Sequence, residues 1–459
     1  MSATNYKLNT DRLWDISMRI DRLEIRNFKK FLDYTLDLHP RFTLLVGDNG
    51  TGKTTILDAL AIAAGIWLVN SPDTTLNNSR RNILPSEIHL ESLKSDTISQ
   101  WIERTPLQIT AIGTIDNQPV QWLRQIKTHG SRTSNTKAKK ALEIISTLFQ
   151  QVEAGEKIWL PIMAYYGAGR AWLPSKQRDP KATTHTGPAR RWDAFYNCFD
   201  ERIRIADLHT WFQKEAIASI NRQGQMRPGY KVVKFAILRC IPNADHLWFD
   251  PERSEIVISI QGNPQPFSNL SAGQKMMVGL IADIAIKIVT QNASFLTEEL
   301  DISSQELPLV LQQTSGLVLI DEIDVHLHPK WQHQVVNDLT KTFPSIQFVC
   351  TSHSPIIIGE VEAKRIRVLE HDEETTSTIA TIPSESYGLD ANRVLHELMR
   401  VSDRNKEVAD KLHALFKLID DEDFDAAHQS IINLTEKLGA SEPEITRART
   451  LIKFLEGNE

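Results

Sequence analysis

The chain has 459 residues, enough for two or three domains or for one large α/β core with an appendage. A hydrophobic fraction of 41%, a charged fraction of 24% and a net charge of −6 are those of an ordinary globular protein, and nothing marks the whole chain as a nucleic-acid binder. The three cysteines (Cys198, Cys240 and Cys350) form no CxxC pair, which argues against a disulfide framework or a zinc knuckle and predicts buried thiols in a reducing compartment. The first 17 residues are polar and no apolar stretch reaches the length of a membrane span, so we expect a cytoplasmic protein.

The first predicted elements surround a glycine-rich segment. Residues 19–25 alternate between polar and apolar, which is typical of a half-buried strand. Residues 42–46 are continuously apolar, which is typical of a central parallel strand buried on both faces. A helix is predicted from Lys53 to about Leu68, because apolar residues recur there at helical spacing.

The next segment is less regular. Residues 71–100 are rich in Ser, Asn and Asp, and we expect an excursion that contributes little to the core. Residues 107–114 and 120–126 then predict a β-hairpin closed by a turn at Asp116 and Asn117.

Two polar stretches are basic, at residues 128–140 and 174–191. Both would suit contacts with a phosphate backbone. Exposed loops are often basic for solubility alone, however, and we favour this simpler interpretation.

The character of the chain changes after Ser384. Apolar residues at helical spacing predict three amphipathic helices, within residues 408–419, 424–438 and 445–455. The predicted organisation is a polar extension over 1–17, a head over 18–383 with insertions near 71–100, 128–155 and 171–230, and a helical region over 384–459.

The first of four motifs is the segment 47–54, which matches GxxxxGK[ST] between a strand and a helix. Glycines let the backbone curl so that successive N–H groups face phosphate oxygens, and the helix adds the positive end of its dipole. Lys53 is expected to reach the β- and γ-phosphates of ATP, and Thr54 to ligate Mg²⁺. The predicted nucleotide contacts are Asn49, Gly50, Gly52, Lys53, Thr54 and Thr55.

The second motif places two carboxylates at the end of the apolar run 316–320. Ligands bind at such strand ends in open α/β sheets. Asp321 is expected to hold Mg²⁺, and Glu322 to polarise the attacking water as general base. The alternative interpretation is a strand that ends in a solvated acidic turn. It is less favoured because the glycine loop is present in the same chain.

The third and fourth motifs complete the set. His353 follows the apolar run 346–350 and could sense a γ-phosphate, although a lone histidine is usually structural. Ser271, Gly273 and Gln274 lie in an LSxGQ pattern, where a serine and a backbone amide can bind an anion at a helix N-terminus. Alone, this pattern is merely a helix-capping serine. Together, in this order along the chain, the four motifs are far more specific than any one of them alone. The predicted catalytic residues are Lys53, Glu322 and His353.

These motifs resemble the ABC-type P-loop ATPase heads shared by SMC, RecF and OLD (overcoming-lysogenization-defect) proteins. Residues 20–28 resemble the first strand of those heads, and residues 321–329 resemble the OLD and RecF-like branch. The resemblance implies an α/β head with a mixed sheet and flanking helices, with ATP and Mg²⁺ bound at composite sites in a homodimer or higher homo-oligomer. His328 stands where an aspartate is usual in transporters and SMC heads. Residues 160–170 take the place of a glutamine loop, so that Arg170 is either a nucleotide contact or a structural residue.

A narrower resemblance covers most of the chain from Met18 onward. Residues 165–170, 321–332 and 387–395 resemble the Septu-type (PtuA) ATPases of bacterial anti-phage defence, including retron-associated forms. This resemblance implies an ATPase that assembles with itself and controls a separate HNH-type nuclease. DNA or retron nucleic acid is a further candidate partner, and no membrane is involved.

Three other functions are alternatives. An OLD-like nuclease would need a TOPRIM domain after His353, but Asp421 and Asp423, which have the required spacing, fall in a loop between predicted helices. A RecF-like DNA repair ATPase would use the same chemistry, so the sequence leaves repair open beside defence. The His-Leu-His-Pro run argues against a transporter subunit.

Overall fold

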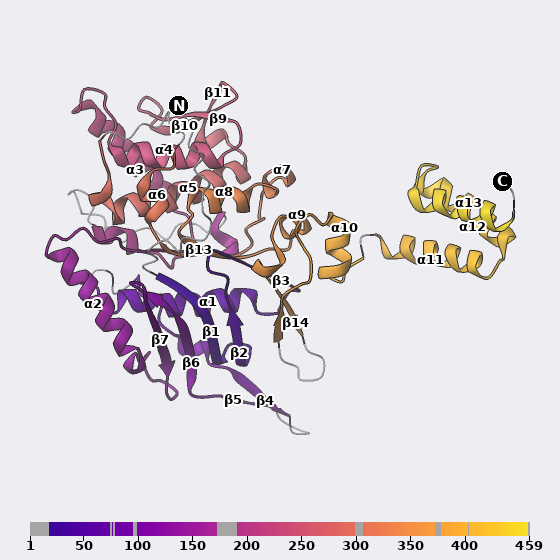
Figure 1. Ribbon diagram of the computed structural model, residues 1–459, viewed down its shortest axis with the longest axis horizontal. Helices are drawn as coiled ribbons and strands as arrows, with labels where there is room; N and C mark the ends of the chain where they lie inside the picture. Colours follow the sequence, from indigo (N-terminus) through magenta and orange to yellow (C-terminus); the bar gives the residue numbers. More distant parts are fainter. Residues whose placement is uncertain are drawn as a thin grey trace, which may run out of the picture. The chain divides into compact units, whose positions relative to one another are not determined.

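The computed structural model describes residues 18–73, 76, 79–94, 99–171, 191–298, 306–371, 378–402 and 404–457 (Figure 1). Contacts within the chain separate a larger unit, ending at Asp390, from a smaller unit that begins at Ala391. The predicted extension 1–17 and the basic stretch 174–190 lie outside the described residues. No helix in the described ranges is long and apolar enough to cross a membrane.

The larger unit is built on a six-stranded sheet with the order β15-β14-β3-β13-β12-β8. The strands are β3 (Phe42–Gly47), β8 (Ile162–Tyr166), β12 (Gly316–Ile320), β13 (Ile346–Thr351), β14 (Ile366–His371) and β15 (Thr378–Thr381). All neighbours pair in parallel except β15, which is antiparallel, so the predicted mixed sheet is confirmed. The apolar runs of β3, β12 and β13 are buried because both faces of the inner strands are covered.

A second, antiparallel sheet has the order β2-β1-β6-β7. Its strands are β1 (Met18–Phe28), β2 (Phe31–Asp37), β6 (Leu107–Ile115) and β7 (Gln118–Ile126). The predicted hairpin is confirmed by the pairing of β6 with β7. Its turn residues Asp116 and Asn117 have φ angles of 49° and 56°, the left-handed conformations that a two-residue hairpin turn requires.

Helix α1 (Lys53–Ala64) contacts both sheets, and most of its side chains are buried. The helix predicted to reach Leu68 ends as an α-helix at Ala64 and continues as a 3₁₀ turn over Gly65–Leu68. Side chains of β7 account for this difference. Arg124 donates a hydrogen bond to the carbonyl of Ile62, and Trp122 donates one to the carbonyl of Ala63, so these carbonyls have partners from outside the helix.

The segment 71–100 contributes more to the core than expected. Three of its apolar side chains are buried in the main core: Leu76, Ile83 and Ile88. They are too sparse to form a period, which is why the sequence did not reveal them. Leu90, Trp101 and Ile102, in the hairpin of β4 (Leu90–Lys94) and β5 (Ser99–Glu103), are exposed.

Helices gather on the other side of the six-stranded sheet from α1 (Figure 1). They are α3 (Ile205–Ile220), α4 (Pro228–Cys240), α5 (Ala272–Gln291), α6 (Leu309–Gln313) and α8 (Val335–Thr342). A small sheet, β9 (Ala244–Asp250), β10 (Glu255–Ile260) and β11 (Asn263–Pro266), separates α4 from α5 in the chain, while α2 (Lys139–Glu153) packs near β7. All three cysteines are buried and free, as predicted.

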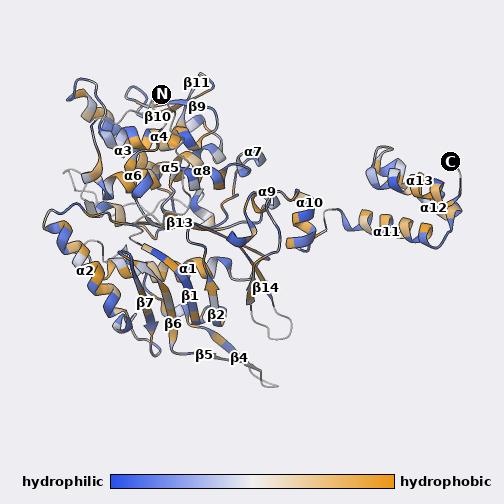
Figure 2. Cartoon of the chain, viewed as in Figure 1, coloured by the Kyte–Doolittle hydropathy of each residue, from blue (hydrophilic) through white to orange (hydrophobic). Residues whose placement is uncertain are grey.

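The smaller unit contains the three predicted helices, α11 (Lys406–Asp420), α12 (Phe424–Leu438) and α13 (Pro443–Leu455), after a short helical turn, α10 (Ala391–Arg393). They share a core of their own, which includes Leu415, Ile431 and Ile452. Figure 2 shows polar and apolar residues along each helix, as an amphipathic pattern requires. Asp423 accepts a hydrogen bond from the Ala426 amide (3.2 Å), so it caps α12.

Candidate functional site

The loop between β3 and α1 has the backbone of a phosphate-binding loop. Gly47, Gly50 and Gly52 have φ angles of 145°, 82° and 104°, conformations that glycine adopts without strain. A Cβ on Gly52 would lie 2.5 Å from the ring of Phe31, so a side chain is excluded there by contact as well. Gly52 directly precedes α1, whose first amides have no earlier helical carbonyl to bind.

Lys53 is folded back onto this loop. Its Nζ donates hydrogen bonds to the carbonyls of Gly47 (2.7 Å) and Asp48 (2.9 Å), and the residue is 7% exposed. Burial lowers the pKa of Lys53, although Asp321, Asp48 and Glu322 oppose this shift. The ammonium group is thus held by neutral carbonyls that anionic phosphate oxygens can replace.

Thr54 and Asp321 meet although they are 267 positions apart: Thr54 Oγ1 donates a hydrogen bond to Asp321 Oδ2 (2.8 Å). A hydroxyl and a carboxylate are ligands that Mg²⁺ takes, commonly with phosphate oxygens and water completing its shell. No group of three or more His, Cys, Asp or Glu side chains among the described residues could hold a metal ion. The pair fits Mg²⁺ whose shell is completed by the phosphate oxygens of a nucleotide and by water.

Thr351, at the end of β13, links the two acidic residues. Its hydroxyl donates to Asp321 Oδ1 (2.6 Å) and accepts a hydrogen bond from the Glu322 amide (2.7 Å). Thr351 is not among the residues predicted from sequence, although its position at the end of an apolar run, two residues before His353, was an available signal. Because β13 lies between β3 and β12, it places half-buried His353 at the same edge as the glycine loop and the acidic pair.

Glu322 begins the turn after β12. Its φ angle is 50°, and its carbonyl accepts a hydrogen bond from the Val325 amide (3.0 Å). Arg170 approaches the same turn from the segment after β8 and donates to the carbonyls of Asp321 and Glu322. The sequence left open whether Arg170 contacts nucleotide. The structure turns its guanidinium toward the backbone of the acidic pair, where burial lowers its pKa.

The Ser271 motif forms the N-terminus of α5. Ser271 Oγ accepts a hydrogen bond from the Gln274 amide (3.3 Å), and Gln274 Oε1 accepts one from the Ser271 amide (2.9 Å). This is a capping box. A Cβ on Gly273 would lie 2.4 Å from the carbonyl oxygen of His326, so only glycine allows α5 to pack this closely on the turn after the acidic pair. In the part of the chain that the structure describes, no hydrogen bond joins this motif to the glycine loop, and Ser271 is exposed.

The remaining predicted contacts, Asn49, Gly50 and Thr55, lie on the glycine loop and the first turn of α1. His328 N-caps the short helix α7 (Pro329–Gln332), since its Nδ1 accepts a hydrogen bond from the Lys330 amide (3.2 Å). Aspartate is also a favoured N-cap residue.

Lys30 is a second residue that the sequence analysis missed. It lies in the turn between β1 and β2, and its Nζ donates a hydrogen bond to the carbonyl of Gly50. Burial lowers its pKa. No local pattern marks it, because the contact depends on how the antiparallel sheet packs against the loop.

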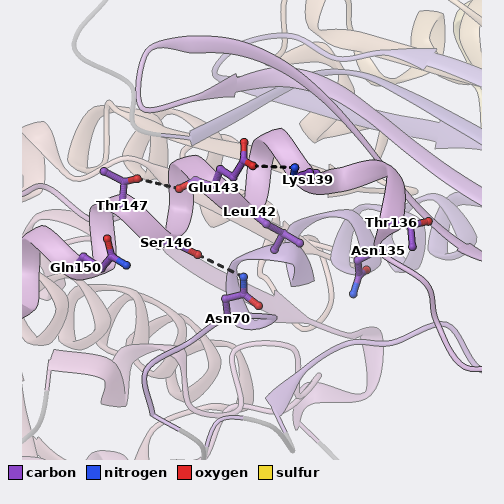
Figure 3. A pocket seen from close by; sticks show the side chains of 9 residues that line it. All are labelled: Asn70, Asn135, Thr136, Lys139, Leu142, Glu143, Ser146, Thr147 and Gln150. Carbon is purple, nitrogen blue, oxygen red and sulfur yellow. Dashed lines mark hydrogen bonds and ion pairs between the residues drawn. The ribbon is translucent and has the colours of Figure 1, made fainter.

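A polar groove of about 600 Å³ beside α2 contains none of the predicted site residues (Figure 3). Within it Asn70 donates to Ser146 (3.3 Å) and Lys139 pairs with Glu143 (3.6 Å). Its lining offers no candidate for the chemistry of the glycine loop.

The chain is similar to several known proteins. Two family models match the chain, "AAA domain" over residues 22–224 and "AAA domain, putative AbiEii toxin, Type IV TA system" over residues 239–359. The "Retron Vc95 probable ATPase" of Vibrio cholerae serotype O1 biovar El Tor is 24% identical over 90% of this chain and 85% of that protein. The "Septu protein PtuA" of Bacillus mycoides (strain KBAB4) is 22% identical over 80% of this chain and 42% of that protein. An SMC head bound to the C-winged helix domain of ScpA matches with a TM-score of 0.44 and 16% identity, over 79% of this chain and 97% of that one.

Proposed function

We propose that the chain is an ATPase that binds Mg²⁺-ATP on the loop 47–54 and hydrolyses it with Glu322 as general base. The observation that carries this proposal is the hydrogen bond between Thr54 and Asp321 (2.8 Å). It brings the end of the glycine loop against the acidic pair across 267 positions of sequence. The similarity to retron and Septu proteins supports the same activity.

Different residues of the chain have different roles in binding and hydrolysing ATP. Thr54 and Asp321 would hold Mg²⁺, which would supply positive charge to the phosphate oxygens. Lys53 turns from its carbonyl partners to the phosphates, while Glu322 orients a water and accepts its proton. His353 senses the γ-phosphate. The amides of the loop, with Asn49, Gly50, Gly52 and Thr55, cradle the remaining phosphate oxygens.

The site is completed by a second copy of the chain. Ser271, Gly273 and Gln274 form an already capped helix N-terminus, at which Ser271 is exposed. Such an end attracts anions, and no described hydrogen bond ties it to its own glycine loop. We therefore place it on the nucleotide bound by a partner head, giving a homodimer with two composite sites.

The role in the cell follows from the resemblance to Septu and retron ATPases. The ATP cycle would open and close the heads and so control an HNH-type nuclease during anti-phage defence. A RecF-like role in DNA repair is the alternative, because it would use the same heads.

Replacing Lys53 tests the binding site. In Lys53→Ala the charge-assisted hydrogen bonds to phosphate are lost, and ATP affinity is expected to fall about 10- to 100-fold. Equilibrium binding of Mg²⁺-ATP measures this, with Lys139→Ala, an exposed lysine on α2, as the control. Unchanged affinity in Lys53→Ala would remove the phosphate-binding assignment.

Removing the smaller unit tests the nuclease link. A chain ending at Asp390 retains the hydrogen bonds of Ser386 to Val361 and of Gly388 to Gly359, so the larger unit should remain folded and hydrolyse ATP. Phe454 is 81% exposed on α13, and we expect this unit to dock the nuclease. Co-purification with an HNH-type nuclease encoded beside the gene should therefore be lost. Heads that aggregate would show a stabilising role instead, and heads that keep the nuclease would place its docking surface elsewhere.

A further inference from the structure

The turn that carries Glu322 has an unfavourable backbone. A non-glycine residue at a φ angle of 50° crowds its Cβ against the following carbonyl, and such conformations persist only where surrounding contacts determine them. The direction of the Glu322 carboxylate depends on this backbone, because the side chain leaves from the same Cα. Whatever holds the peptide groups on either side of Glu322 therefore holds the proposed base.

Arg170 and Thr351 provide most of that support, beside the bond within the turn from the Val325 amide to the Glu322 carbonyl (3.0 Å). The Asp321 amide donates to the carbonyl of Tyr166 (2.8 Å), and the carbonyls of Asp321 and Glu322 accept from Arg170. The Glu322 amide donates to the Thr351 hydroxyl (2.7 Å), and the Ile323 amide donates to the Thr351 carbonyl (2.9 Å). In the two peptide groups that flank Glu322, Arg170 thus binds both carbonyls and Thr351 binds both amides.

The surroundings of Arg170 favour its contact with the carbonyls of Asp321 and Glu322 over contact with a ligand that binds from solvent. The residue is 3% exposed, and its three described hydrogen bonds reach the carbonyls of Gly167, Asp321 and Glu322. The planar fork of a guanidinium can bind two successive carbonyls at once, whereas an ammonium group acts as a point charge. Burying such a cation is costly, and charge-assisted hydrogen bonds to fixed carbonyl dipoles offset the cost.

We propose that Arg170 is a positioning residue for hydrolysis, which holds the Asp321–Glu322 turn so that Glu322 faces the attacking water. This inference rests on the proposed function, since it takes Glu322 as the general base. Arg170 acts only through the turn and does not touch the nucleotide. Its loss should lower the rate of hydrolysis and leave ATP binding intact.

Arg170→Lys is the first test. The lysine keeps the charge but cannot span both carbonyls, so kcat should fall about 10- to 100-fold, as for other small misplacements of a reacting group. KM and the equilibrium affinity for Mg²⁺-ATP should change less than threefold. If Arg170→Lys does not fold, Arg170→Gln, whose amide can still donate to one carbonyl, replaces it.

A buried arginine elsewhere provides the matched control. Arg124 is fully buried and donates to the carbonyls of Ile62 and Arg81, but it lies at the other end of α1 from Lys53. Arg124→Lys should lower the melting temperature without a selective loss of kcat. Equal losses of kcat in the two variants, in proportion to their losses of stability, would make Arg170 merely structural and overturn the proposal.

A double-mutant cycle shows whether Arg170 acts through Glu322. In a Glu322→Gln background, Arg170→Lys should cause no further loss in the slow single-turnover hydrolysis of bound ATP. An additive loss, unchanged kcat in the single variant or a tenfold loss of ATP affinity would each overturn the proposal. Full hydrolysis by Glu322→Gln alone would instead contradict the proposed function, so the two failures are distinguishable.

Discussion

Glu322→Gln is expected to slow ATP hydrolysis about 100- to 10,000-fold, the range that a general base contributes. Glutamine has nearly the same shape, so the backbone bonds from Thr351 and Arg170 should survive. It cannot accept a proton from water. Because Lys53 and the glycine loop are unchanged, Mg²⁺-ATP should bind with native affinity and remain bound.

The measurement is phosphate release at saturating ATP together with equilibrium ATP binding. Glu360→Gln is the matched control, since Glu360 is a carboxylate that pairs with His333 (2.7 Å). It should hydrolyse ATP at the native rate. Hydrolysis by Glu322→Gln within threefold of native would assign the base elsewhere, and lost ATP binding would show that Glu322 contacts nucleotide in the ground state.

Ser271→Arg is expected to abolish hydrolysis although Ser271 has no described hydrogen bond to the glycine loop. The substitution removes the serine cap of α5 and puts a bulky cation on an exposed helix end that is proposed to meet the partner's nucleotide. ATP binding to the variant's own glycine loop should persist. Ser268→Arg, three residues earlier and also exposed, controls for the added charge and should retain most activity.

Mixing two inactive chains separates this model from a site within one chain. In a dimer of Lys53→Ala with Ser271→Arg, one of the two sites joins an intact loop to an intact Ser271 motif. Random pairing in equal amounts should then recover about a quarter of native activity, given a symmetric dimer with independent sites. If mixed dimers form and no activity returns, the two motifs do not act between chains.

The sequence alone was enough to predict the elements whose signals are local. The run 42–46 is apolar without interruption and is followed by glycines where the backbone turns, so the strand, the loop and the start of α1 were all predicted. The acidic pair after β12 and the three helices of the smaller unit were predicted for the same reason, because the apolar period of each lies within one segment. Asp116 and Asn117 marked a hairpin turn, since these residue types tolerate a left-handed backbone.

Only the tertiary structure decided how the acidic pair is held and where α1 stops. Arg170 binds carbonyls about 150 positions away. Thr351, on the neighbouring strand β13, bonds to both the Asp321 carboxylate and the Glu322 amide. Arg124 and Lys30 likewise bond to backbone carbonyls of distant segments. A carbonyl is the same at every position of a sequence, so nothing local shows which one a buried cation will meet. Those partners are determined when the two sheets pack on α1 and β8 pairs with β12, because a buried cation then bonds to the polar groups within its reach.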